Sequence, residues 1–208
     1  MSFRIEEKIR LHISDLNKFK IFLSKNTGKL LYPKRKIFST YLDNKNFEMY
    51  KDSEEGVSPR KKIRVRNYPN SLNADYKLEK KVSSVEGKFK SSRKINIIDK
   101  NQIDINGVYD SQYGTCNNVI NVSYIREYFV IFDVRITIDY DIKYESYFDS
   151  RFFLDRNILV VELKSNNNII NVLDKVSEFF PFQRERYSKY CKGIDSLYNI
   201  KSNYPQVI

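Results

Sequence analysis

The sequence has little of the chemistry on which many enzyme families depend. Its 208 residues include a single histidine, His12, two cysteines, Cys116 and Cys191, and no tryptophan. A Ser–His–Asp or Cys–His nucleophile would have to use that one histidine, and no G-x-S-x-G segment is present. The glycine-rich loops that usually bind nucleotides, G-x-x-x-x-G-K-S/T and G-x-G-x-x-G, are also missing. The sequence therefore disfavours nucleophilic catalysis with a histidine base and nucleotide binding by such a loop.

Disulfides, zinc and membrane spans are equally disfavoured. The two cysteines form no C-x-x-C or Cys/His cluster, so neither a zinc site nor a disulfide framework is expected. No apolar run approaches the ~18 residues that a bilayer span requires. The first ten residues alternate charged and apolar side chains, unlike a signal peptide. We expect a soluble chain in a reducing cytoplasm, with Cys191 as a small buried side chain.

The charge balance is strongly positive. Lys and Arg number 37 against 26 Asp and Glu, which gives a net charge of +11, while 41% of residues are hydrophobic. Such a chain is globular, long enough for one domain, and suited to anionic partners: nucleic acid, phosphorylated small molecules, polyphosphate or acidic lipid. A Lys- and Asn-rich composition would also raise the net charge with solvated lysines. The positions of the charges must decide between these readings.

Charged residues recur at every second position in several segments, which is the period of a β-strand. The first segment, Phe3–Ile13, carries its charged or polar side chains at positions 4, 6, 8, 10 and 12, with Glu7 as an exception. Further strands are predicted at Lys62–Tyr68, at Tyr76–Val82, around Arg126 and Arg135 within Val119–Ile138, and at Ile158–Lys164. After the first helix, which is described below, comes the segment Lys36–Leu42. A turn-like stretch, Asp43–Asn46, separates it from a second segment, Phe47–Tyr50. His12 is expected to be a strand residue near one end.

Two helices are expected beside these strands. Ser14 and Asp15 can cap the first, whose apolar residues recur at helical spacing until Gly28 ends it. The second runs from Ile169 to Phe180 and is stopped by Pro181. The polar stretch 51–59 is predicted to be a loop, and residues 95–118 show no clear period beyond one short helix.

The charged faces suggest how the strands assemble. A half-exposed antiparallel sheet also alternates charged and apolar residues, and such a sheet is enough to explain the pattern of any one strand. Here, however, Arg and Lys recur at i and i+2 with an acid nearby in strand after strand. Closing such a sheet with its charged faces inward would form a polar tunnel, with the apolar faces packed outward under helices. The predicted fold is therefore α+β, a closed antiparallel β-barrel with flanking helices that forms one domain over residues 1–208.

Eight short motifs follow one another in the order known for one family. They are Phe3–Lys8, Thr40–Tyr50, Lys62–Tyr68, Leu78–Lys81, Ser123–Arg126, Arg135–Asp139, Val161–Lys164 and Arg186–Tyr190. In this order the sequence resembles the VTC domain, the polyphosphate-polymerase branch of the triphosphate tunnel metalloenzyme (CYTH-like) superfamily. Each motif alone is weak, but together they cover the chain from Phe3 to Gly193.

The resemblance implies a tunnel of about eight strands that holds a nucleoside triphosphate and a growing polyphosphate chain. It implies that the phosphate ligands are basic residues, namely Lys8, Arg64, Arg66, Lys81, Arg126, Arg135, Lys164, Arg186 and Lys189. It also implies that Glu162 binds Mn²⁺ or Mg²⁺, with Glu6 and Glu79 as secondary candidates. Forked guanidinium groups and lysine ammonium groups suit phosphate, and these metals take oxygen ligands. The implied activity is metal-dependent polyphosphate synthesis from a nucleoside triphosphate such as ATP.

Two alternatives remain open. A tripolyphosphatase or nucleoside-triphosphatase needs the same tunnel, because water only has to replace the phosphate acceptor. A non-catalytic module that binds a polyanion, such as an inositol phosphate or RNA, would need the same charges. Nucleic acid is the less expected partner, since the basic run Pro59–Lys62 continues into a strand-like alternation. Compared with the family, the interval between Lys94 and Val119 is short, and the strand at Val119–Arg126 lacks the proline that usually precedes it.

Overall fold

A computed structural model describes residues 5–69, 76–165, 169–180 and 187–198, which form an α+β fold built on antiparallel strands. In chain order the elements are β1 (Ile5–His12), the 3₁₀ helix η1 (Ile13–Asp15), α1 (Leu16–Lys25), β2 (Lys29–Asp43), α2 (Glu48–Glu55), β3 (Arg60–Asn67), β4 (Tyr76–Ser84), β5 (Gly87–Ile95), α3 (Ile97–Asn106), β6 (Val108–Asp110), β7 (Gly114–Ile131), β8 (Val134–Ser146), β9 (Phe152–Asp155), β10 (Ile158–Ser165), α4 (Ile169–Phe179) and α5 (Lys189–Tyr198). The predicted class, α+β with an antiparallel sheet, is confirmed.

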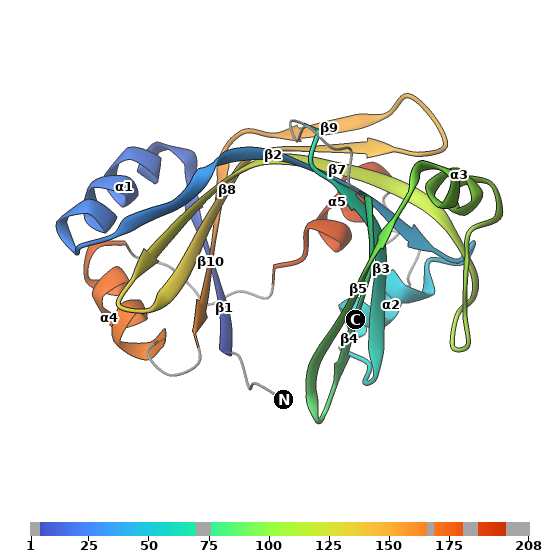
Figure 1. Ribbon diagram of the computed structural model, residues 1–208, viewed down its shortest axis with the longest axis horizontal. Helices are drawn as coiled ribbons and strands as arrows, with labels where there is room; N and C mark the ends of the chain where they lie inside the picture. The colour runs from blue at the N-terminus through green and yellow to red at the C-terminus, as the bar shows by residue number, and fades with distance from the viewer. Residues whose placement is uncertain (1–4, 70–75, 166–168, 181–186, 199–208) are drawn as a thin grey trace, which may run out of the picture. The chain divides into compact units, whose positions relative to one another are not determined.

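The strands pair in the order β1–β10–β8–β7–β2–β3–β4–β5, with β6 on β7 and β9 on β8 (Figure 1). These are ten strands within the described residues, against about eight expected for a tunnel of this kind. Strands β5, β6 and β9 were not predicted from the sequence. Strands β1 and β5 lie at the two ends of the pairing order, so closure of the sheet into a barrel stays a prediction.

The chain divides into two compact units. The first unit comprises Met1–Lys36, Tyr124–Ile142 and Leu154–Tyr187. The second comprises Ile37–Ser123, Lys143–Phe153 and Ser188–Ile208. Strands β2, β7 and β8 are long enough to contribute residues to both units. The prediction of a single domain stays a prediction.

In the first unit, the apolar faces of the strands pack under helices, as predicted. Alternation places Ile9 of β1, Val161 of β10 and Ile138 of β8 on one side of the sheet, and all three are at most 1% exposed. Helices α1 and α4 cover this side, with Phe19 and Val176 in the same core (Figure 1). Burial of such side chains, at about 25 cal/mol per Å² of apolar surface, stabilises the unit. It leaves the charged side chains of the same strands on the opposite face.

In the second unit, α5 lies on the side of β2 and β3 that carries charges, a position that the sequence pattern did not predict. The ring of Tyr190 stacks on Tyr41, with centroids 5.2 Å apart. The hydroxyl of Tyr190 donates to the buried carboxylate of Asp43. Lys62 Nζ donates to Ser188 Oγ at 2.8 Å just before the helix begins. Because its contacts are polar at this end, α5 can pack against a face that an ordinary apolar helix would avoid.

Helix α2 corrects the prediction of a loop over residues 51–59 at positions 51–55, whereas residues 56–59 are in neither helix nor strand. Phe47 is the N-cap of this helix, and Glu48–Tyr50 form its first turn. The reason is that the side chain of Asp43, which precedes the helix, caps its first turn. Asp43 Oδ1 accepts hydrogen bonds from the amides of Asn44 and Met49, at 2.8 and 3.0 Å, and Oδ2 accepts from the amide of Tyr50 at 3.0 Å. These amides have no partner inside a helix, so a buried carboxylate before the first turn stabilises its start. The distance in sequence between cap and helix hides this signal.

The two predicted helices form close to their expected bounds. Helix α1 begins after Asp15 and is followed by Gly28, whose amide donates to the carbonyl of Leu23 at 2.7 Å. Helix α4 matches the second prediction up to Phe179, and Pro181 lies outside the described residues. His12 ends β1 and Cys191 is buried, both as predicted. The short helix expected between residues 95 and 118 is α3.

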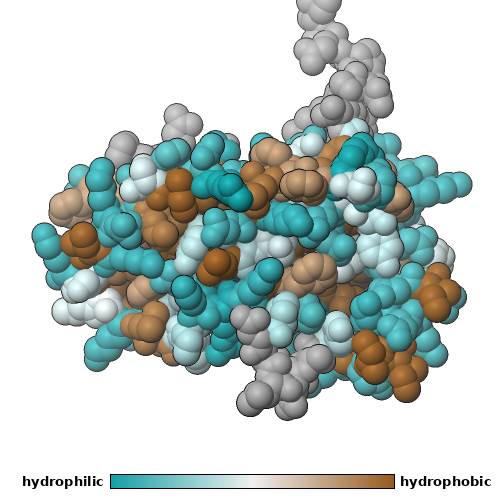
Figure 2. All heavy atoms as spheres, turned by 90° about the horizontal axis from the view of Figure 1, so that it is seen from above, coloured by the Kyte–Doolittle hydropathy of each residue, from teal (hydrophilic) through white to brown (hydrophobic). Residues whose placement is uncertain are grey.

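Surface and helix lengths bear on the membrane question. In the described part of the chain, no helix combines the length and the apolar character that a bilayer span needs. Figure 2 shows one face of the molecule, on which hydrophobic residues occur in small groups among hydrophilic ones.

Candidate functional site

The first unit has a face on which cations and carboxylates alternate, here called the mixed-charge face. Antiparallel register sets Lys8 of β1 opposite Glu162 of β10, and Glu6 opposite Lys164, so the four side chains lie on one side of the sheet. Lys8 Nζ lies 3.6 Å from Glu6 Oε1 and 3.8 Å from Glu162 Oε1. Lys164 Nζ lies 3.5 Å from Glu6 Oε2 and 3.3 Å from Glu162 Oε2. Four residues predicted to belong to the site are thus brought together.

Arg126 of β7 extends this face. Its Nε and Nη2 donate to the two carboxylate oxygens of Asp139 on β8, at 2.5 and 2.6 Å, and Nη2 lies 3.8 Å from Glu162 Oε2. Burial would lower the pKa of Arg126, but the carboxylates of Asp139 and Glu162 and the Tyr124 hydroxyl outweigh burial and raise this pKa well above its ordinary value. Asp139 was not predicted to be a site residue, although the alternation of this strand places it on the same face as Arg135 and Thr137.

Glu162 is only 7% exposed. Burial alone would raise its pKa, but a hydrogen bond with Glu6 and the charges of Lys8, Lys164 and Arg126 lower the pKa of Glu162 well below its ordinary value. Two carboxylates within hydrogen-bond reach suit a hard divalent cation that completes its shell with phosphate oxygens and water. In the part of the chain that the structure describes, no cluster of three or more Asp, Glu, His or Cys residues could hold a metal alone.

Two buried polar atoms on the mixed-charge face have no hydrogen-bond partner among the described residues: Arg135 Nε and Thr137 Oγ1. Register sets Arg135 opposite Lys164, and Thr137 opposite Glu162. Nearly all buried polar groups in folded proteins are hydrogen-bonded, because a buried donor without a partner is costly. The two atoms therefore indicate a place where a ligand with acceptor oxygens can bind.

The second unit has a face dominated by cations, here called the basic face. The registers of β3, β4 and β5 place on one side of the sheet the residues Arg60, Lys62, Arg64, Arg66, Lys77, Glu79, Lys81, Ser83, Lys88, Lys90, Ser92 and Lys94. Lys81 stands between Lys62 on β3 and Lys90 on β5, so three cations form a row across the strands. The lysines of β5 were missed, although Lys88, Lys90 and Lys94 already show a period of two in the sequence.

Glu79 is the one carboxylate on the basic face. Arg64 Nε donates to Glu79 Oε2 at 2.7 Å, and Arg66 Nη1 lies 3.9 Å from the same oxygen. Lys90 Nζ donates to Oε1 at 2.5 Å. Burial would raise the pKa of Glu79, but Arg64, Arg66 and Lys90 lower this pKa to about 2. Both oxygens therefore accept hydrogen bonds from cations, which favours a counter-ion role for Glu79 over metal binding.

Tyr41 and Ser39 of β2 hold the two arginines from the other side. Arg64 Nη1 donates to Tyr41 Oη at 2.9 Å, and Arg66 Nε donates to Ser39 Oγ at 3.2 Å. Burial would raise the pKa of Tyr41, but the charges of Arg64, Arg66 and Lys189 lower it to about 8. Lys189, the first residue of α5, is thereby placed near the basic face. Arg186, also predicted, lies outside the described residues.

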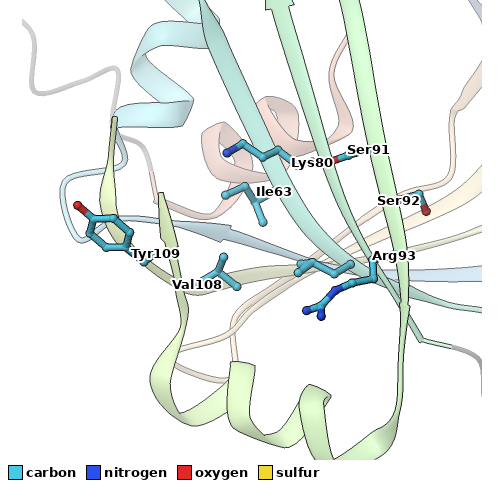
Figure 3. A pocket seen from close by; sticks show the side chains of 8 residues that line it. Ile63, Lys80, Ser91, Ser92, Arg93, Val108 and Tyr109 are labelled. Carbon is cyan, nitrogen blue, oxygen red and sulfur yellow. The ribbon is translucent and has the colours of Figure 1, made fainter. Parts of the chain in front are cut away.

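A cavity of about 300 Å³ lies on the other side of the same strands (Figure 3). Ile63 and Leu78, which alternate with Arg64 and Glu79, form part of its wall. Figure 3 shows the Arg93 side chain extending from β5 into this region, with α3 nearby. Most of the residues that line the cavity therefore lie on the side of β3–β5 opposite to the basic face.

Solved structures share this fold over nearly the whole chain. A protein from Bacillus halodurans, proposed to be an adenylate cyclase, is 11% identical with a TM-score of 0.62, covering 91% of this chain and 97% of its own. A second protein proposed to be an adenylate cyclase, from Vibrio parahaemolyticus, is 13% identical with a TM-score of 0.54, covering 91% and 96%. A conserved hypothetical protein from Pyrococcus furiosus is 13% identical with a TM-score of 0.53, covering 88% and 98%.

Sequence comparison gives the family. No curated protein matches the sequence. The VTC domain profile, in contrast, matches residues 3–112 and residues 99–198, which together include every residue of the two charged faces. The resemblance stated from eight short motifs is thus confirmed over nearly the full length. This chain belongs to the VTC domain family.

Proposed function

We propose that this chain is a metal-dependent phosphotransferase that extends polyphosphate with phosphoryl groups from a nucleoside triphosphate. One observation carries the proposal: the basic face holds nine lysines and arginines against a single carboxylate, Glu79. Arg66 and Glu79 are 6% and 5% exposed, and the other basic side chains that β3 and β4 place on this face are half-buried, whereas the lysines of β5 are exposed. A partly buried excess of cations favours a highly charged anion that neutralises it. Polyphosphate supplies one negative charge or more at each phosphate.

A divalent metal, Mn²⁺ or Mg²⁺, is part of the proposal. Glu162 would hold it with Glu6, because these carboxylates lie together and the orphaned donors of Arg135 and Thr137 beside them suit phosphate oxygens. Glu79 is the weaker candidate, since both of its oxygens accept hydrogen bonds from cations, at 2.7 and 2.5 Å, whereas the two lysines near Glu6 and Glu162 lie 3.3–3.8 Å from their oxygens. When bound, the metal would neutralise charge on the phosphate oxygens and help to orient them.

The residues of the chain have a limited task in this reaction. A terminal phosphate is already an anion, so it can attack without a general base, which is consistent with a chain that has one histidine. Arg64 and Arg66, fixed by Glu79, Tyr41 and Ser39, would hold phosphate oxygens in place and offset their repulsion. Arg126, kept charged by Asp139, would do the same on the mixed-charge face.

Closure of the sheet completes the proposal. We infer that the chain is a single domain with a closed tunnel lined by charged side chains, as the family resemblance implies. Lys8, Lys81, Arg135, Lys164, Arg186 and Lys189 would then act as further phosphate ligands. The support is that several strands carry an alternating charged face and that residues 3–198 match the family.

The products formed from ATP and Mn²⁺ test this function. The purified protein should yield a ladder of polyphosphate on a gel, and Glu162→Gln, which keeps shape but loses the charge, should yield little. Free phosphate without a ladder would instead indicate a hydrolase. Tight tripolyphosphate binding without turnover would indicate a binding module, and cyclic AMP would indicate the activity proposed for two of the structural neighbours. Each of these results would overturn polymer synthesis as the function.

A further inference from the structure

We propose that Thr137 contacts the ligand of the mixed-charge face directly, by donating a hydrogen bond from its hydroxyl to an oxygen of a phosphoryl group bound beside Glu162. This inference rests on the proposed function and extends it, because Thr137 lies in the Arg135–Asp139 motif but is not among the residues that the resemblance implies as ligands. It also gives a role to a buried hydroxyl for which the described residues provide no partner.

Strand register places Thr137 at the centre of the face. It lies opposite Glu162 on β10, and alternation along β8 puts Arg135 and Asp139 on the same side of the sheet. The backbone of β8 is paired with β10, and a β-branched side chain has few rotamers, so the hydroxyl can reach only a few positions. Thr137 is therefore held in place before any ligand arrives.

Burial makes the hydroxyl informative. Thr137 is 1% exposed, so bulk water does not replace the missing partner. Thr40 provides the contrast within the same protein, since its buried hydroxyl donates to Asn121 Oδ1 at 2.8 Å. Valine has nearly the same shape as threonine and would fill the position of Thr137 without an orphaned polar atom. The hydroxyl thus costs the ligand-free protein stability, which favours a use in the ligand-bound protein.

The neighbouring groups define the class of ligand. Arg135 Nε, the second orphaned atom, can only donate, and a threonine hydroxyl can donate as well. Two donors separated by two residues of a strand lie within about 7 Å along the backbone, so their side chains can reach oxygens of one phosphoryl group or of adjacent groups. Lys164, opposite Arg135, adds a positive charge. An oxyanion with several acceptor oxygens satisfies all three groups.

The test separates a ligand contact from a structural role. Urea unfolding without ligand and calorimetric titration with tripolyphosphate would be measured for the wild type, Thr137→Val, Thr137→Ser and Thr40→Val. Thr137→Val should unfold at the same or a higher urea concentration, yet bind tripolyphosphate about tenfold more weakly. Thr137→Ser keeps a hydroxyl and should retain most of the affinity. Thr40→Val loses a satisfied hydrogen bond, so its unfolding midpoint should fall while its affinity stays unchanged.

Two results would overturn the inference while leaving the proposed function intact. One is Thr137→Val binding tripolyphosphate as tightly as the wild type. The other is a fall in the unfolding midpoint of Thr137→Val like that of Thr40→Val, which would show that the hydroxyl stabilises the ligand-free fold. If the wild type itself does not bind tripolyphosphate, the proposed function fails and the role of Thr137 fails with it.

Discussion

Glu79 offers the sharpest test of the electrostatics of the basic face. Its carboxylate is the counter-ion of Arg64, Arg66 and Lys90, so Glu79→Gln keeps the shape of the side chain and leaves three neighbouring cations without their shared negative charge. We expect the ligand-free variant to be markedly less stable than the wild type at neutral pH. Bound tripolyphosphate should reduce the deficit, because the polyanion supplies negative charge to the same cations.

The magnitude follows from the pKa of Glu79. A fall from its ordinary value of 4.5 to about 2 corresponds to about 3 kcal/mol, at about 1.4 kcal/mol per pKa unit. The Glu79 side chain is 6% exposed, so little of this is screened, but the Lys90 side chain is 49% exposed and its share is smaller. We therefore expect a loss of about 2–3 kcal/mol in the free energy of unfolding.

The pH dependence gives a second, independent check. Because the pKa of Glu79 is lower in the folded state, its contribution is fully present above pH 4.5 and is lost as pH falls through about 2. The gap between wild type and Glu79→Gln should therefore narrow across this range. Urea unfolding at a series of pH values measures it, with Glu86→Gln, at the exposed turn between β4 and β5, as the matched control. A Glu79→Gln variant as stable as Glu86→Gln at pH 7 would refute the reasoning.

Three further predictions concern the same unit or its ligand. Lys81→Ala should weaken tripolyphosphate binding about tenfold in calorimetry, because it removes the middle cation of the row formed by Lys62, Lys81 and Lys90. Lys18→Ala, which changes an exposed lysine, should leave the affinity unchanged. Equal losses of affinity at both positions would indicate a diffuse basic surface. The pKa of Tyr41 is lowered to about 8, so the wild type should gain stability relative to Tyr41→Phe as pH rises from about 8 to 10. Phenolate absorbance should appear in the same pH range. If the two proteins show no difference, pairing with Arg64 does not lower the pKa of Tyr41. Gly193→Ala should destabilise the protein by about 1–3 kcal/mol, since the new Cβ would lie 2.7 Å from the Tyr144 ring, and an unchanged melting temperature would show that α5 can shift.

Much of the strand content was determined locally by the sequence. In β1, β3, β4 and β10, alternation of charged and apolar residues encodes both the strand and its two faces, because the period of a strand is two wherever it pairs. The order of eight motifs was likewise sufficient for the family. Strand β5 was not predicted because residues such as Ser91 and Arg93 leave its second face only weakly apolar. It forms because its backbone pairs with β4 from Tyr76 to Ser84, a long-range cause.

Tertiary structure alone decided what each charged residue does. Glu162 and Glu79 look alike in the sequence, each two residues from a lysine on an alternating strand. Register sets Glu162 beside a second carboxylate, Glu6, and sets Glu79 among cations from two other strands. The same applies to Thr137, which register sets opposite Glu162 and whose buried hydroxyl has no hydrogen-bond partner in the described part of the chain. Spacing along one strand specifies which face a side chain occupies, but its charge state and partners depend on strands that are distant in the sequence.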